Sequence, residues 1–224
     1  MASVMRPAIQ AVIFDMDGLM IDSELLHQEA WQVMLSRFGY EIDKALFARL
    51  AGMRISEDAV LLREHFCLPL TAEALARQRN DLFLARLPGR VKPMPGLGEL
   101  MAEIGRRGLR CALATSGERR YVEAVRRELN LDGVFDAIAV AEDVERGKPA
   151  PDVYLLAAQR LGLQPAQCLV LEDAPNGVAA AQAAGMRCVA VLNEMTRSLD
   201  LSAADAILPS LLAVRDNLDM LMRL

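Results

Sequence analysis

The chain has 224 residues, of which 53% are hydrophobic, and its formal net charge is −5. This length and composition predict one sizeable packed core, with room for a small inserted domain, and exclude a disordered chain. The acidic balance, without a basic stretch, argues against a nucleic-acid partner. There is no run of 18 apolar residues and no apolar leader, so we expect no membrane partner.

Four cysteines lie at positions 67, 111, 168 and 188. None belongs to a C-x-x-C pair and no histidine cluster accompanies them, so a zinc site is not expected. We expect a reduced, cytoplasmic protein.

The first predicted element is a β-strand over Ile9–Phe14. This apolar run lacks in-out alternation, which is typical of a strand buried on both faces. Asp15 and Asp17 follow it directly. Two carboxylates this close resist joint ionisation unless a cation or a phosphate group compensates them. On its own, the pair is equally consistent with a turn and with a functional site.

The next segment, from Asp22 to Leu87, is helical in pattern and contains no convincing strand. Ser56 and Thr71 are candidate N-caps, and the expected helices are Glu24–Phe38, Lys44–Ala51, Ser56–Phe66 and Thr71–Leu87. We therefore predict a four-helix cap at residues 22–89, inserted into a catalytic core of residues 1–21 and 90–224. The cap would lie above the carboxyl end of the first strand, where open α/β sheets bind ligands.

Strands and helices alternate after the predicted cap. Strands are expected over Arg110–Thr115, Ala137–Val140, Gln167–Leu171 and Arg187–Leu192, and helices over Gly96–Arg107, Glu118–Asn130, Pro151–Leu161 and Asn176–Ala184. This alternation predicts an α/β fold with a doubly wound, Rossmann-like parallel sheet. The carboxyl ends of the strands would then share one edge of the sheet.

Polar residues follow three of these later strands. Thr115 precedes a helix, where hydroxyls and amides can bind phosphate, although a simple cap is the commoner role. Lys148 precedes a proline, which favours an extended backbone at the lysine, although an exposed loop lysine would look the same. Glu172 and Asp173 form a second acidic pair. Acids, hydroxyls and an ammonium gathered at one edge indicate a site for Mg²⁺ and phosphate.

The order of these motifs, together with the helical insert after the first one, resembles the haloacid dehalogenase-like superfamily over roughly Ala8–Asn193. The segments Ile13–Glu24 and Leu171–Val178 are especially similar to its sugar-phosphate phosphatases and β-phosphoglucomutases. Dehalogenases of the superfamily need neither the metal nor an acid two residues after the nucleophile. The presence of Asp17 therefore favours phosphoryl transfer.

The resemblance implies a role for each motif residue. Asp15 would attack phosphorus and form an aspartyl phosphate, and Asp17 would serve as general acid and then as general base. Thr115 and Lys148 would hold the phosphoryl oxygens, and Ser116 would bind substrate. The resemblance also implies a Mg²⁺ ion, which would be held by the Asp15 carboxylate, the Asp17 backbone carbonyl and Asp173. Glu172 would either bind the ion directly or contact its ligands.

By the same resemblance the cap would supply specificity, with His27, Arg54 and Arg79 as candidate substrate-binding residues. His27 matches a histidine near the acid/base aspartate of mutase-like sequences, although a merely packed histidine is the simpler interpretation. Arg79 stands where the mutase cap carries lysine, and the two cations differ in geometry. Glu118 stands where mutases tend to carry lysine, and a carboxylate there would not bind a second phosphate.

We therefore predict a Mg²⁺-dependent phosphatase of small phosphorylated metabolites, sugar or polyol monophosphates, that acts as a monomer. The alternative is a β-phosphoglucomutase-like enzyme, in which a sugar hydroxyl replaces water as the group that attacks the aspartyl phosphate. A signalling receiver domain also carries acids at strand ends, but it is shorter and has no helical insert. A catalytically inactive binding module would share the fold, although none of the motifs is missing.

Overall fold

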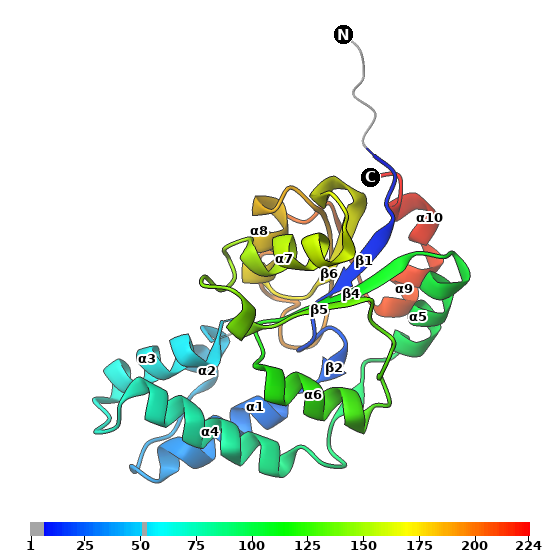
Figure 1. Cartoon of the computed structure of the whole chain (residues 1–224). Coiled ribbons are helices and arrows are strands. Elements are labelled where there is room, and N and C mark those ends of the chain that lie inside the picture. The colour runs from blue at the N-terminus through cyan, green and yellow to red at the C-terminus, as the bar shows by residue number, and fades with distance from the viewer. Residues whose placement is uncertain (1–6, 51–52) are drawn as a thin grey trace.

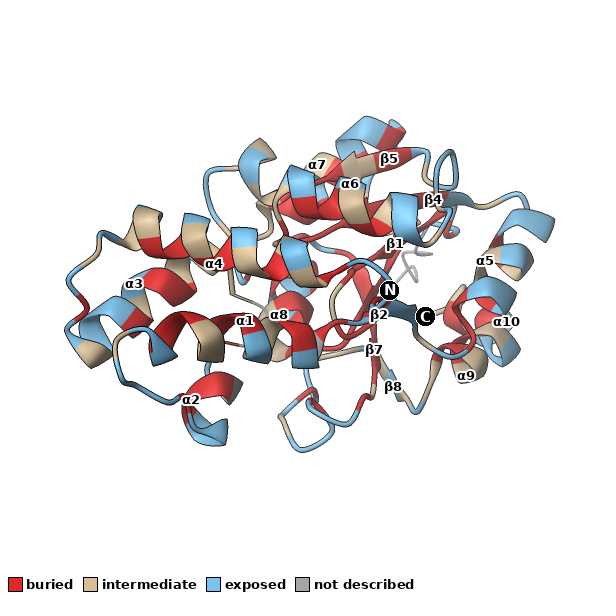
Figure 2. Ribbon diagram, turned by 90° about the horizontal axis from the view of Figure 1, so that it is seen from below, coloured by how far each residue is buried: buried red, intermediate tan, exposed pale blue. Residues whose placement is uncertain are grey.

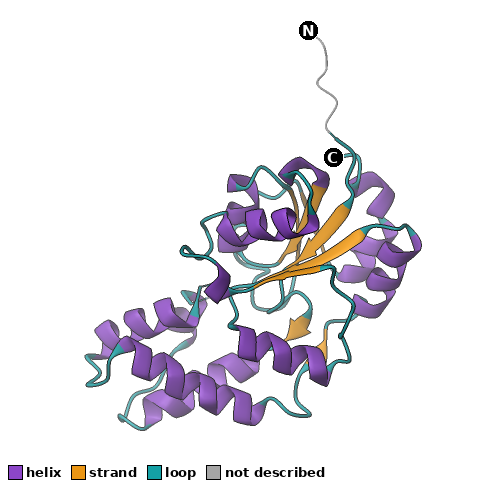
Figure 3. Cartoon of the chain, in the orientation of Figure 1, coloured by secondary structure: helices purple, strands orange, loops and turns teal. Residues whose placement is uncertain are grey.

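The computed structural model describes residues 7–50 and 53–224. Its sheet is built around β1 (Ala11–Phe14), which is fully buried. The strand order is β5-β4-β1-β6-β7-β8, and every pairing in this six-stranded sheet is parallel. Figures 1 and 3 show the sheet with helices on either side of it. The other strands are β4 (Arg110–Ala114), β5 (Ala137–Ala139), β6 (Cys168–Glu172), β7 (Arg187–Val191) and β8 (Ala206–Leu208). The predicted doubly wound α/β fold is confirmed.

Helices cover both faces of the sheet, because alternate side chains of each strand point to opposite sides. Val12 and Phe14 pack into one apolar cluster, while Ala11 and Ile13 pack into a second. The first cluster is covered by α5 (Leu97–Arg106), α6 (Arg119–Glu128), α9 (Leu211–Asp216) and α10 (Leu218–Leu221). The second is covered by α7 (Asp152–Leu161) and α8 (Pro175–Ala183).

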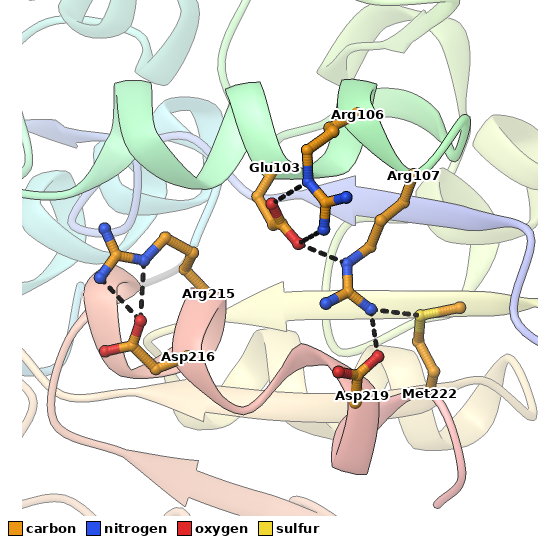
Figure 4. Close-up of polar contacts among 7 residues, drawn as sticks. All are labelled: Glu103, Arg106, Arg107, Arg215, Asp216, Asp219 and Met222. Carbon is orange, nitrogen blue, oxygen red and sulfur yellow. Dashed lines mark hydrogen bonds and ion pairs between the residues drawn. The ribbon is translucent and has the colours of Figure 1, made fainter.

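Ion pairs lie among the helices α5, α9 and α10, which cover the first cluster (Figure 4). Arg106 and Arg107 both donate to Glu103, at 2.8 Å and 2.6 Å from their Nε atoms, and Arg107 also contacts Asp219 on α10. These bonds lower the pKa of Glu103 to about 2. Because solvent screens charges at the surface, we attribute the packing of α5 on α9 to the apolar cluster beneath them.

The cap consists of α1 (Glu24–Ser36), α2 (Lys44–Ala48), α3 (Ile55–Phe66) and α4 (Ala72–Arg86). These helices enclose an apolar cluster of their own, whose buried members include Trp31, Leu62 and Leu75. Figure 2 shows buried positions along α1, α3 and α4. Two chain segments connect the cap to the core, and they pair as the antiparallel strands β2 (Ile21–Asp22) and β3 (Lys92–Pro93). The predicted boundaries at 22 and 89 lie close to this pair and stay a prediction.

Two details of the predicted cap helices have different outcomes. Thr71 is the N-cap of α4, where its hydroxyl accepts from the backbone N–H of Ala74 at 3.2 Å. The prediction of Ser56 as an N-cap was wrong, because α3 begins at Ile55 and Ser56 lies within its first turn. Its N-cap is Arg54, whose backbone N–H donates to the Glu57 carboxylate at 3.2 Å. The predicted end of the second helix, Ala51, lies outside the described residues.

Several short elements were not predicted: β2, β3, β8, α9 and α10. Each has six residues or fewer, which is too short for a hydrophobic period to stand out. Among the described helices, none combines the length and apolar character needed to cross a lipid bilayer.

Candidate active site

The strand-end residues converge on one cavity between the sheet and the cap. Asp15 follows β1, Thr115 follows β4, and Asp173 follows β6, so the parallel topology brings them to the same edge. Lys148 reaches the cavity from the loop before α7. Asp15, Thr115, Lys148 and Asp173 are all buried, and all of them line the cavity. The structure thus brings together groups that lie 158 positions apart at most along the chain.

The centre of the site is an acidic cluster with one ammonium. One carboxylate oxygen from each of Asp15, Glu172 and Asp173 lies within 4.8 Å of the others. The Nζ of Lys148 donates to Asp15 Oδ1 at 2.5 Å and to Glu172 Oε1 at 2.6 Å. Burial raises the pKa of Asp15 to about 8, although Lys148 lowers it. Further positive charge at this position would favour the ionised, nucleophilic form.

Glu172 is held in place by four donors. Its Oε1 accepts from Lys148 and from the Tyr154 hydroxyl at 2.6 Å, and its Oε2 accepts from the backbone N–H groups of Asp173 and Ala174 at 2.8 Å and 3.1 Å. Gly177 leaves the space for this carboxylate, because a Cβ there would lie 1.6 Å from Oε1. Glu172 therefore orients the lysine and its own loop.

Asp173 faces the loop that follows β1. Asn193 links the two, since its Nδ2 donates to Asp173 Oδ2 at 2.7 Å and to the Gly18 carbonyl at 3.1 Å. Gly18 has a φ of 77°, and a Cβ there would lie 2.3 Å from Asp173 Oδ2. The Asp15 and Asp173 carboxylates are buried hard oxygen ligands with excess negative charge around them, so this donor set fits a small divalent cation.

Asp17 points away from the acidic cluster, toward the cap. Its Oδ1 is contacted by the Ser23 hydroxyl at 2.5 Å, by His27 Nε2 at 3.1 Å and by the Tyr121 hydroxyl. Burial alone would raise the pKa of Asp17, but His27, Ser23 and Tyr121 together lower it below its usual value. The carboxylate is thus stabilised in its ionised form by groups from the core and from the cap.

Arg79 determines which tautomer His27 adopts. The guanidinium of Arg79 contacts His27 Nδ1, and because arginine only donates, Nδ1 must be the acceptor. Nε2 therefore carries the hydrogen and donates to Asp17. Burial and the neighbouring Arg79 lower the pKa of His27, which agrees with a neutral ring. The Arg79 guanidinium itself lies over the rings of Trp31 and Phe83, 5.5 Å and 4.8 Å from their centres.

The remaining predicted site residues differ in their placement. Ser116, His27 and Arg79 line the cavity. Arg54 lies outside its described lining, and its guanidinium instead donates to the carbonyls of Glu145 and Val144, both at 3.0 Å. Arg54 as a substrate ligand stays a prediction, and its observed contact joins the cap to the loop that carries Lys148.

Four residues of the site were not singled out from the sequence: Ser23, Tyr121, Tyr154 and Asn193. Asn193 could have been predicted, because it is a polar residue just after the strand β7, as Asp15, Thr115 and Asp173 are after theirs. Tyr121 and Tyr154 lie on α6 and α7, where the sequence pattern predicts only that an aromatic side chain belongs to the apolar core.

Comparison with known proteins agrees with this geometry. The family model described as haloacid dehalogenase-like hydrolase matches residues 9–185. Fructose-1-phosphate phosphatase YqaB of Escherichia coli is 39% identical over 183 residues, which is 80% of this chain and 95% of that protein. The probable pseudouridine-5'-phosphatase of Drosophila melanogaster is 35% identical over 219 residues, 94% of each chain.

Among solved structures, CbbY of Rhodobacter sphaeroides in complex with phosphate superposes with a TM-score of 0.85 at 31% identity, covering 92% of this chain and 96% of that one. The expected family is thereby confirmed: the chain belongs to the haloacid dehalogenase-like hydrolases and is an enzyme of that family.

Proposed function

We propose that the protein is a Mg²⁺-dependent phosphoric monoester hydrolase that acts on small sugar or polyol monophosphates through an aspartyl-phosphate intermediate. The observation that carries the proposal is the convergence of four side chains on one cavity, which is lined by Asp15, Asp17, Thr115 and Lys148. The phosphatase names of the relatives support the same reaction class.

In the first half of the reaction, the Asp15 carboxylate attacks phosphorus, and the bond between phosphorus and the substrate oxygen breaks. Asp17 gives its proton to that oxygen, so the alcohol leaves neutral. Lys148 and the Thr115 hydroxyl hold the phosphoryl oxygens and neutralise part of their charge.

In the second half, a water molecule attacks the phosphorus of the aspartyl phosphate. Asp17, now ionised, accepts a proton from this water, and the bond between phosphorus and the Asp15 oxygen breaks. Inorganic phosphate leaves, and both aspartates return to their starting states. Three donors on its Oδ1 favour the ionised form of Asp17 that this step needs.

The residues that would hold Mg²⁺ are the Asp15 and Asp173 carboxylates and the backbone carbonyl of Asp17. Glu172 would not bind the ion itself but would hold the neighbouring groups in place, because both of its oxygens already accept hydrogen bonds. When bound, Mg²⁺ would offset the repulsion between the anionic nucleophile and the anionic phosphoryl group.

The mutase alternative would need a second phosphate-binding position. Glu118 lines the cavity, and burial and the nearby Glu142 raise its pKa. A carboxylate here repels a second phosphate, which favours water over a phosphosugar as the group that discharges Asp15. Supplying β-glucose 1-phosphate with catalytic 1,6-bisphosphate tests this: nearly complete conversion to glucose 6-phosphate, with little free phosphate, would support the mutase.

A phosphate-release screen tests the main proposal. The purified chain is incubated with a panel of phosphorylated metabolites, with Mg²⁺ and with EDTA, and we expect Mg²⁺-dependent release from sugar or polyol monophosphates. Asp15→Asn should lower the rate by at least about 10³-fold, because it removes the nucleophile. The proposal fails if folded Asp15→Asn, checked by circular dichroism, still releases phosphate at the original rate. The monomeric state and cytoplasmic location expected from the sequence stay predictions.

A further inference from the structure

The carboxylate of Asp17 is contacted on one oxygen by three side chains. Ser23 Oγ lies 2.5 Å and His27 Nε2 lies 3.1 Å from Oδ1, and the Tyr121 hydroxyl contacts the same atom. A carboxylate oxygen has two lone pairs, so three donors leave Oδ1 without capacity for a proton. If Asp17 carries a proton to the leaving group, that proton must sit on Oδ2.

Of the three donors, Tyr121 alone comes from the core. Ser23 directly precedes α1 and His27 lies on it, whereas Tyr121 lies on α6 beside the strand β4. The contact between Tyr121 and Asp17 therefore joins two parts of the core.

The ring of Tyr121 is held on several sides. It packs edge-on against Phe83, with 4.8 Å between ring centres and 85° between planes, and against His27 at 5.7 Å and 83°. Gly117 provides the space, because a Cβ there would lie 3.0 Å from Tyr121 Cδ1. Tyr121 is buried. The direction of its hydroxyl is thus determined by packing, which is what a group that orients another side chain requires.

We propose that Tyr121 is a positioning residue for proton transfer: its hydroxyl holds Oδ1 of Asp17, so that Oδ2 faces the leaving oxygen. The inference rests on the proposed function, because it assigns a role within that reaction. It does not make Tyr121 a catalytic residue, since its contact is with Asp17.

The test uses the dependence of the reaction on the leaving group. An alkoxide must be protonated as it leaves, whereas p-nitrophenolate leaves without a proton. Tyr121→Phe keeps the ring and removes the hydroxyl. We expect it to lower kcat/KM about tenfold for a sugar or polyol phosphate, because a misplaced Asp17 loses part of the rate gain from general acid catalysis. For p-nitrophenyl phosphate, whose leaving group needs no proton, we expect a loss of less than about twofold. The ratio kcat/KM reports the step in which the alcohol leaves.

A series of aryl phosphates, from p-nitrophenyl to phenyl phosphate, adds a readout that a structural role would not change. Tyr121→Phe should steepen the decline of kcat/KM as the phenol becomes less acidic. Tyr40→Phe is the matched control, because it removes the hydroxyl of a half-exposed tyrosine of the cap, and we expect all its rates to match those of the original protein.

Equal losses on both kinds of substrate, or no loss on the alkyl phosphate, would overturn the role assigned to Tyr121. Neither result would affect the proposed function, which is tested separately by Asp15→Asn with p-nitrophenyl phosphate. If Asp15→Asn kept full activity there, the reaction itself would be wrong and the role of Tyr121 with it.

Discussion

Arg54 of the cap packs directly against Gly147 of the core. A Cβ at Gly147 would lie 2.7 Å from Arg54 Nε, and the guanidinium donates to the carbonyls of Val144 and Glu145 at 3.0 Å. The same loop continues into Lys148, which contacts Asp15. One cap side chain thus contacts the loop that positions Lys148.

Removing this contact should weaken catalysis more than folding. We expect Arg54→Ala to lower kcat/KM for the best phosphate ester about tenfold, because cap and core would no longer be held together over the substrate. In the described part of the chain, the hydrogen bonds of this half-exposed guanidinium go to two loop carbonyls, so the melting temperature should change little. Steady-state phosphate release and a thermal melt measure both quantities. Arg49→Ala, an exposed arginine of the same cap segment, is the control, and equal kcat/KM values for the two variants would contradict the prediction.

Gly177 should be essential because of Glu172. In Gly177→Ala the Cβ would lie 1.6 Å from Glu172 Oε1, so the carboxylate must move and Lys148 loses a partner. We expect a loss of roughly 1–3 kcal/mol in the free energy of unfolding, typical of overpacking, together with a large fall in activity. Urea denaturation and phosphate release test this.

Gly98→Ala is the matched control for that substitution. Gly98 lies inside α5, and no atom of the described residues comes within 4 Å of its Cβ position, so alanine there should stabilise the chain by roughly 0.5–1 kcal/mol. A Gly177→Ala protein with unchanged stability and activity would show that the loop of Glu172 adapts freely.

Asp173 should set the requirement for Mg²⁺. In Asp173→Asn one carboxylate of the donor set becomes neutral, so the Mg²⁺ concentration for half-maximal activity should rise at least about tenfold. Tyr154→Phe, which removes a donor to Glu172, should shift that concentration less, since under the proposed function Glu172 would not bind the ion itself. A Mg²⁺ titration of the phosphate-release rate compares them. An Asp173→Asn curve that overlies the original would argue against Asp173 as a ligand.

The four cysteines should differ sharply in reactivity. Burial raises the pKa of Cys111 to about 12 and that of Cys168 to about 11, and it also raises the pKa of Cys188, whereas Cys67 is exposed. Because the thiolate is the reactive form, a thiol reagent at pH 7.5 should label Cys67 quickly and the others only after denaturation. Mass spectrometry counts the labels, and Cys67→Ser should abolish the fast phase. Rapid labelling of a second cysteine in the native protein would refute the buried placement.

The sheet and the edge that carries the site were predictable from local pattern. Strands buried on both faces need continuous apolar runs, and those runs ended next to Asp15, Thr115 and Asp173. Parallel topology then requires their carboxyl ends to meet. The elements that pattern missed, such as β8 and α9, are too short to carry a period, and the start of α3 depended on Glu57 rather than on Ser56.

What the sequence alone determined is which chemical groups follow the central strands of the sheet, because a local apolar run shows where each of these strands ends. What only the tertiary structure decided is how those groups are oriented: Glu172 bound by four donors, Asp17 turned to Tyr121, and Arg54 placed on the loop of Lys148. The physical reason is that a side chain's direction depends on neighbours far away in the chain. Asp17 and Tyr121 are 104 residues apart, and no local pattern relates them.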